Sequence, residues 1–190
     1  MPWILKSDDD MIINTLALSP YLHKLEKHFS KELLNKGFKN VINREEKINN
    51  SQNLLGFDKI LCAVWYGMPV LRGEPKDCAK WCVSHEQWPY NQYPIYCSGS
   101  AFLIPTHLAP RLYTSYFKSR FLWVDDAYIS GVLAKTAGVT HRPIHSLYEL
   151  NHFLIEKNLI RGNRLFCHHP GKAAERKKWW PLIAEKERAH

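Results

Sequence analysis

The sequence contains no apolar run of the roughly 18 to 20 residues that a helix needs to cross a bilayer. Its N-terminus also lacks the basic segment, apolar core and cleavage site of a secretory leader. The 190 residues are 45% hydrophobic and 13% aromatic, which is typical of a folded domain with a sizeable core. We therefore expect one domain that spans residues 1–190.

Basic residues are in excess, but the sequence lacks a concentrated basic patch. The net charge is +8, and the one modest cluster consists of Lys172, Arg176, Lys177 and Lys178. Such scattered charge is typical of a solvated surface, although it would also attract a polyanion or a nucleotide diphosphate. Charge alone therefore leaves a basic nucleic-acid-binding module open as an alternative to a nucleotide-dependent enzyme.

The cysteines do not indicate one kind of site. There are five, an odd number that leaves at least one unpaired: Cys62, Cys78, Cys82, Cys97 and Cys167. Cys78 and Cys82, with His85 and Cys97 behind them, match the spacing of a zinc site only loosely. Disulfides and free buried thiols are the other interpretations, so a zinc-stabilised structural module stays an alternative.

Three consecutive aspartates, Asp8, Asp9 and Asp10, lie between two short apolar runs at residues 3–5 and 11–13. An apolar run that ends abruptly in acids predicts a buried strand whose end carries the carboxylates to a cleft. Hard oxygen ligands on a short turn suit Mg²⁺ or Mn²⁺, which could neutralise the phosphates of a substrate. The alternative is a solvated acidic turn that caps the next element.

A second acidic pair, Asp125 and Asp126, follows the apolar residues 121–124 and opens a predicted helix that Gly138 ends. Ordinary capping explains such a pair without any chemistry. The two carboxylates need not share one role, however. One can cap the helix and stay ionised, while the other points into a cleft and accepts a proton from an attacking hydroxyl.

Two further candidate groups lie outside the acidic motifs. The irregular segment 69–94 is crowded with aromatic residues, and Trp88 and Tyr93 could stack against a sugar ring, although most such residues simply pack. His168 follows the apolar pair Leu165 and Phe166, and its neutral imidazole could complete a Mn²⁺ site that the early aspartates leave partly open. A surface or packing role is the alternative for this histidine.

Local patterns predict several elements that would position these groups. Strands are expected at residues 60–65 and 101–104, and helices at residues 106–118 and from Ser19 and Pro20 to Gly37. Ser146 and Glu149 have the spacing of a capping box, which predicts another helix from that point.

Three sequence blocks taken in order resemble glycosyltransferase family 31, the group of β1,3-galactosyltransferases, β1,3-N-acetylglucosaminyltransferases and Fringe-related enzymes. The blocks are Lys6-Ser7-Asp8-Asp9-Asp10 with Asn14, then Tyr93-Pro94-Ile95-Tyr96-Cys97-Ser98-Gly99, then Asp125-Asp126-Ala127-Tyr128 with Gly131. Each block alone is weak, but their order is specific. The resemblance covers about residues 3–180 and includes matches at His168 and Trp179.

The resemblance implies a mixed α/β fold of the GT-A type and the transfer of a hexose, with inversion, from a UDP-sugar to a glycan acceptor through a β1,3 linkage. It implies Mn²⁺ bound by Asp10 and His168, and donor contacts from Asp8 and Asp9. The pair Asp125 and Asp126 would supply the catalytic base, with Asp126 favoured, and Gly99 would lie where the donor and acceptor pockets meet. The expected partners are a nucleotide sugar and a glycan, glycoprotein or glycolipid acceptor, with no nucleic acid.

The sequence also departs from the family. Family members are Golgi membrane proteins with an N-terminal anchor, a stem and early strands that hold uracil and ribose, and none of these precedes Asp8 here. We therefore expect an N-terminally truncated member that keeps the metal, acceptor and base regions of a lumenal domain, with membrane attachment only through the missing anchor. The main structural expectation is that the acidic triplet and the acidic pair converge on one pocket.

Overall fold

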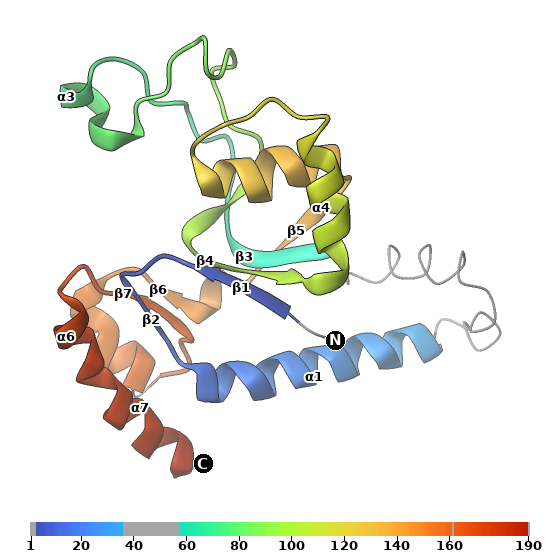
Figure 1. Cartoon of the computed structure of the whole chain (residues 1–190). Coiled ribbons are helices and arrows are strands. Elements are labelled where there is room, and N and C mark those ends of the chain that lie inside the picture. Colours follow the sequence, from blue (N-terminus) through green and yellow to red (C-terminus); the bar gives the residue numbers. More distant parts are fainter. Residues whose placement is uncertain (1–2, 36–57, 161, 190) are drawn as a thin grey trace. The chain divides into compact units, whose positions relative to one another are not determined.

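A computed structural model describes residues 3–35, 58–160 and 162–189. The chain divides into two compact units. Unit 1 contains Ser7–Asp58 and Ile144–His190, and unit 2 contains Pro2–Lys6 and Lys59–Pro143. Each unit combines helices with a small sheet (Figure 1), which confirms the predicted mixed α/β class. None of the helices in the described ranges is both long and apolar enough to cross a membrane.

Unit 2 is built on a four-stranded mixed sheet with the order β1-β4-β3-β5. Strand β3 pairs antiparallel with β4 and parallel with β5. The strands are β1 (Trp3–Ser7), β3 (Lys59–Trp65), β4 (Tyr96–Pro105) and β5 (Thr140–Pro143). The helical segments are α3 (Pro75–Cys78), η2 (Ala79–Trp81), η3 (Thr106–Leu108), α4 (Ala109–Tyr116), η4 (Ala127–Leu133) and α5 (Ala134–Thr136). The strands predicted at 60–65 and 101–104 and the helix predicted at 106–118 are therefore confirmed.

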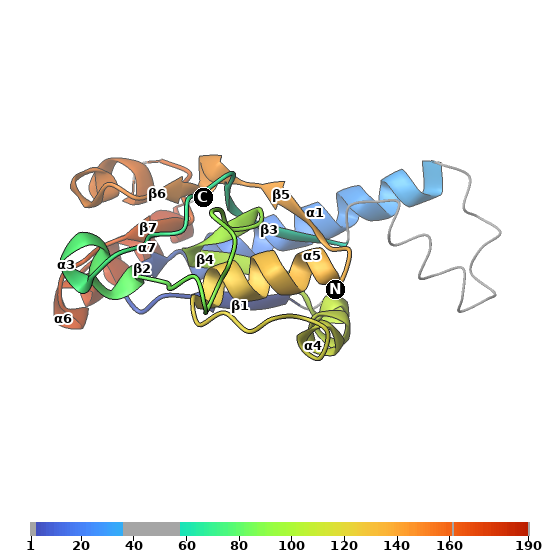
Figure 2. The ribbon, with the colours of Figure 1, turned by 90° about the horizontal axis from the view of Figure 1, so that it is seen from above.

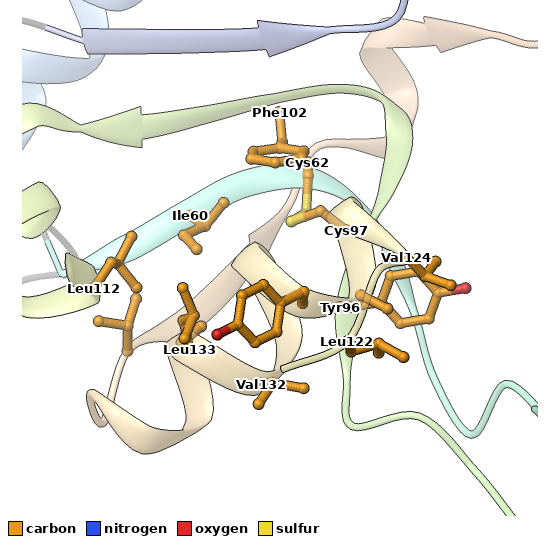
Figure 3. Packing of buried hydrophobic residues seen from close by; sticks show 14 of the residues in the cluster. Ile60, Cys62, Tyr96, Cys97, Phe102, Leu112, Leu122, Val124, Val132 and Leu133 are labelled. Atoms are coloured by element: carbon orange, nitrogen blue, oxygen red, sulfur yellow. A yellow bond between two sulfur atoms is a disulfide. The ribbon is translucent and has the colours of Figure 1, made fainter. Parts of the chain in front are cut away.

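The core of unit 2 lies between this sheet and the helix formed by η4 and α5, which runs over β4 (Figure 2). Strand β3 is almost entirely buried, since five of its seven residues contribute buried side chains. Figure 3 shows that Ile60 and Phe102 from the sheet and Leu133 from the helix contribute to the same cluster. Burial of this apolar surface is the main term that stabilises unit 2.

The helix predicted after the second acidic pair begins and ends as expected. The carboxylate of Asp126 accepts a hydrogen bond from the backbone N–H of Ala127 at 2.7 Å, and Gly138 follows the last turn with a φ of +67°. A positive φ at this point is the left-handed conformation that glycine adopts without a steric penalty. The first part, η4, is a π-helix.

Unit 1 contains a three-stranded sheet in the order β2-β7-β6. Strand β2 pairs antiparallel with β7, and β6 pairs parallel with β7. The strands are β2 (Met11–Ile13), β6 (Tyr148–Glu149) and β7 (Phe166–His168). The helical segments are α1 (Thr15–Asn35), η5 (His145–Leu147), η6 (His152–Leu154), η7 (Glu156–Ile160), α6 (Ala173–Lys177) and α7 (Trp179–Arg188). Its core cluster consists of Ile12, Ile155, Leu159, Cys167 and Ile183.

Two local predictions in unit 1 were wrong. The first helix begins at Thr15 and not at Ser19, because the side chain of Asn14 accepts a hydrogen bond from Ala17 N at 3.0 Å and caps the helix earlier. Its predicted end at Gly37 lies outside the described residues. Glu149 does not form a capping box, because it lies on β6 and its carboxylate accepts a hydrogen bond from Asn151 N at 2.8 Å.

The structure distinguishes between the zinc site, the disulfides and the free thiols that the cysteine spacing left open. Cys62 is bonded to Cys97 and Cys78 to Cys82, while Cys167 is free and buried. Zinc binds cysteine as the thiolate, and a cysteine in a disulfide has no thiolate to offer, so the zinc site at Cys78, Cys82 and Cys97 was wrong. The zinc-stabilised structural module is overturned with it.

Candidate active site

The acidic triplet occupies the turn between β1 and β2. Asp8 and Asp9 are exposed in this turn, and Asp10 is partly buried directly before β2. The antiparallel register of β2 with β7 places Met11 opposite His168, and the backbone N–H of His169 donates to the carbonyl of Asp10 at 2.9 Å. Strand pairing therefore fixes the backbone of Asp10 beside the histidine strand.

The same register brings two predicted metal ligands together. The Asp10 Oδ2 atom lies 3.2 Å from Nε2 of His168, and the two side chains are 40% and 33% exposed. A carboxylate and an imidazole are suitable ligands for Mn²⁺, and partial exposure would let substrate and water oxygens complete the coordination shell. Within the described ranges, no group of three or more His, Cys, Asp and Glu side chains is placed to hold a metal. Asp8 and Asp9 therefore do not join Asp10 and His168 in a group of three or more ligands.

Asn14, the motif residue after the triplet, anchors this part of unit 1. It is fully buried, and its backbone N–H donates to the Leu165 carbonyl at 2.9 Å. Its side-chain amide donates to Glu187 Oε1 at 2.8 Å. One residue therefore ties β2 to α7 and to the segment that leads into β7, and a buried polar side chain with these partners is a specific constraint on the backbone.

The second acidic pair lies in unit 2 and divides into two environments. Asp125 is exposed, and its Oδ2 atom lies 3.1 Å from Nζ of Lys6. Asp126 is partly buried and caps η4. The two adjacent carboxylates therefore have different surroundings. The sequence interpretation assigned the cap and the cleft carboxylate to different residues, whereas Asp126 caps η4 and also lines a cavity.

Gly99 on β4 connects these groups. The ammonium of Lys6 donates to the Gly99 carbonyl at 3.0 Å, and the backbone N–H of Gly99 donates to the carboxylate of Asp126. Lys6 also lies over the ring of Phe102, with 5.7 Å between Nζ and the ring centroid. Gly99 thus contacts the predicted base through its backbone, and Lys6 holds both Gly99 and Asp125.

The environment of Asp126 favours a general base. Burial raises the pKa of its carboxyl above the ordinary range, and the negative charge of Asp125 raises it further. The hydrogen bond from Ala127, the positive charge of Lys6 and the hydrogen bond from Gly99 each lower the pKa and partly offset the increase. A carboxylate with a raised pKa accepts a proton more readily than an exposed one.

Asp126 lines a cavity of about 220 Å³ with aromatic walls, here called the aspartate cavity. The other lining residues are Met68, Pro69, Leu71, Trp81, Tyr93, Tyr96 and Val124. Burial raises the pKa of the Tyr96 hydroxyl to about 12, with contributions from Asp126 and Tyr93. Its phenol is therefore protonated at neutral pH and keeps a hydrogen-bond donor. A small, mostly apolar cavity with one carboxylate and two phenols suits a sugar hydroxyl.

The two predicted aromatic residues differ in position. Tyr93 lines the aspartate cavity, and its ring lies edge-on to that of Tyr96 with centroids 5.8 Å apart. Trp88 does not line it. Trp88 is buried, donates through Nε1 to the Gln92 carbonyl at 3.2 Å and lines a separate cavity.

Sequence reasoning missed three residues of this site: Lys6, Trp81 and Tyr96. Lys6 lies two residues before Asp8, and its position in the first motif block was the available signal. Tyr96 lies inside the second block in the same way. Trp81 had no local signal beyond its place in an aromatic-rich segment, and it stacks on Trp123 with centroids 6.1 Å apart.

Comparisons with known proteins agree with these motifs. The galactosyltransferase family model matches residues 1–145. The chain is 23% identical over 185 residues to beta-1,3-galactosyltransferase 2 of Homo sapiens, covering 95% of this chain and 36% of that protein. It is 24% identical over 111 residues to beta-1,3-galactosyltransferase 1 of Mus musculus, covering 57% and 32%. The chain thus spans about a third of the length of these curated relatives.

Proposed function

This chain belongs to the galactosyltransferase family, and from that premise we propose that it moves a hexose from a UDP-sugar to a hydroxyl of a glycan acceptor, with inversion and a β1,3 linkage. The observation that carries the proposal is Asp126, a partly buried carboxylate with a raised pKa in an aromatic-walled cavity. The relatives described above are named beta-1,3-galactosyltransferases, which supports this linkage. In this proposal both units form one catalytic domain.

Asp126 acts as the base of a single displacement. An acceptor hydroxyl attacks the anomeric carbon of the donor, its proton passes to the Asp126 carboxylate, and the new carbon–oxygen bond forms as the bond to the diphosphate breaks. UDP leaves with the bonding electron pair. Tyr93 and Gly99 would position the sugars, and Asp125, held by Lys6, would keep its charge beside the base.

Asp10 and His168 would hold Mn²⁺, which supplies positive charge to the leaving diphosphate as a Lewis acid. Their separation of 3.2 Å and partial exposure fit two ligands that share a cation with substrate oxygens. Asp8 and Asp9, which are exposed in the same turn, would contact the ribose or the donor sugar. That the acidic triplet and the acidic pair take part in the same reaction stays a prediction.

The Golgi lumen is the proposed compartment. Two disulfides support it, because such bonds persist in the oxidising secretory pathway and are rare in the cytosol. Immunolocalisation with a lumenal protease-protection assay tests this placement, and a cytosolic, protease-sensitive protein would contradict it.

The test of the function is transfer of a labelled hexose from a panel of UDP-sugars to glycan acceptors, with and without EDTA. We expect product only with a divalent metal and loss of turnover in Asp126→Asn. Asp125→Asn removes the neighbouring exposed carboxylate and should lower turnover much less than Asp126→Asn, because only Asp126 is assigned as the base. Metal-independent transfer, or full turnover in Asp126→Asn, would overturn the proposal.

A further inference from the structure

A second and larger cavity in unit 2, of about 1020 Å³, has a distinct chemical character. One wall consists of residues 88–94, with the aromatic side chains of Trp88, Tyr90 and Tyr93. The other wall carries three basic side chains, Lys118, Arg120 and Lys135. No carboxylate is among its lining residues. We refer to it as the cationic cavity.

Hydrogen bonds hold the aromatic wall in shape. The guanidinium of Arg72 donates to the carbonyls of Val83 at 2.6 Å, Trp88 at 2.7 Å and Tyr90 at 2.7 Å. Arg72 is partly buried, and these charge-assisted bonds fix an otherwise irregular segment. The ring of Trp88 packs edge-on against Tyr90 with centroids 5.1 Å apart. A wall braced in this way needs little ordering when a ligand binds.

Arg120 ties the basic wall to the two residues that directly precede the aromatic wall. Its Nε donates to the Gln87 carbonyl at 3.1 Å, and Nη2 donates to the Glu86 carbonyl. The positive charge of Arg120 is therefore fixed at the cavity but not neutralised, because both acceptors are uncharged. Lys118 and Lys135 are exposed and have no carboxylate partner among the residues that the structure describes. Three uncompensated cations at one cavity favour an anion.

Tyr93 connects this cavity to the proposed chemistry, because it lines both the cationic cavity and the aspartate cavity. A glycan chain whose reacting unit occupies the aspartate cavity would therefore extend past Tyr93 to the three basic side chains. Aromatic rings suit the apolar faces of sugars, and ammonium and guanidinium groups suit carboxylate or sulfate.

We propose that the cationic cavity binds an anionic sugar unit of the acceptor glycan, one that carries a carboxylate or a sulfate group. This inference rests on the proposed function for the direction of the glycan, but the binding site itself does not depend on turnover. It assigns Lys118, Arg120 and Lys135 as acceptor-selecting residues, and it implies that an acid-bearing or sulfated glycan is preferred over a neutral one.

Binding is tested first, without catalysis. Saturation-transfer NMR on the full chain measures the binding of three ligands: a glucuronate-containing disaccharide, a sulfated disaccharide and their neutral counterpart. We expect the charged disaccharides to bind and the neutral one to bind at least about threefold more weakly, in keeping with loss of a charge-assisted contact at an exposed site. Comparison of the carboxylate and sulfate arms identifies the group that is recognised.

Variants assign the effect to the cavity. Lys118→Gln and Lys135→Gln should each weaken binding of the charged disaccharide by about threefold to tenfold, with little change for the neutral one. Lys135→Arg keeps the charge and should restore binding. Lys177→Gln removes an exposed lysine of α6 in unit 1 and is the matched control.

The outcomes separate this inference from the proposed function. Equal binding of charged and neutral disaccharides, or an equal loss in Lys177→Gln, overturns the anionic subsite even if hexose transfer is observed. Selective binding that depends on Lys118 and Lys135 supports the subsite even if no transfer is found. Displacement of the charged disaccharide by UDP alone would show that the cavity takes a nucleotide, and would overturn the inference.

Discussion

The carboxylate of Asp10 lies 3.2 Å from the imidazole of His168, although 158 residues separate them in the chain. The contact follows from the pairing of β2 with β7, in which Met11 lies opposite His168. Two short strands therefore join the first acidic motif to a histidine near the C-terminus. If a metal binds here, its affinity should depend on both the Asp10 and the His168 side chain.

Replacement of either ligand should weaken Mn²⁺ binding. We expect Asp10→Asn and His168→Ala each to lower the affinity at least about tenfold, the lower bound for loss of even an outer-shell partner. Calorimetric titration with MnCl₂ in the presence of UDP measures this. His169→Ala is the matched control, since His169 contacts Asp10 only through its backbone N–H among the hydrogen bonds of the described residues. Unchanged Mn²⁺ affinity in both ligand variants would contradict the metal site.

Asp126→Asn should lower kcat by about 10²- to 10⁴-fold, the usual contribution of a positioned base. Asparagine keeps the oxygen that caps η4, so the fold should persist. In the unsubstituted protein the base works only when ionised, so the rate should fall as pH drops through the pKa of Asp126. Because burial raises this pKa, the acidic limb of the kcat/KM profile should lie above the range of an exposed carboxyl. A limb at or below that range would argue against Asp126 as the base.

The two disulfides should differ in their contribution to stability. Cys62 and Cys97 close 35 residues of sequence and are fully buried, whereas Cys78 and Cys82 are only 4 residues apart. Loop-closure entropy predicts a loss of about 4 kcal/mol for the double variant Cys62→Ala/Cys97→Ala and about 2 kcal/mol for Cys78→Ala/Cys82→Ala. Denaturant unfolding without reductant measures both losses. A greater loss in the second variant would contradict the ranking.

Cys167 should be the one thiol that reacts after unfolding without reductant. Burial raises its pKa to about 12, so almost none is thiolate at neutral pH in the folded state. A thiol reagent should therefore label the native protein very slowly and label one cysteine per chain in denaturant. Rapid native labelling, or three or more labelled cysteines in denaturant, would contradict this arrangement.

Sequence reasoning succeeded where the signal was local. The apolar run of β3 and the cap and glycine of the helix after Asp126 depend on neighbouring residues alone. It failed at Glu149, because pairing of β6 with β7 overrode a local capping pattern. The disulfide partners and the contact of Asp10 with His168 depend on strand register. Periodicity cannot give such register. Local context offered His168 as a possible Mn²⁺ ligand, and the family resemblance paired it with Asp10.

Substitution of Lys6 gives the sharpest test of what sets the pKa of Asp126 in the acidic pair. Its ammonium contacts Asp125 and Gly99, and its positive charge lowers the pKa of Asp126. Lys6→Met keeps the apolar stem over Phe102 but removes the charge, so the pKa of Asp126 should rise further. The acidic limb of the kcat/KM profile should then move to higher pH, with a fall in rate at neutral pH. Lys6→Arg keeps the charge and should leave the limb in place. An equal shift in both variants would show that Lys6 acts by packing and not by its charge.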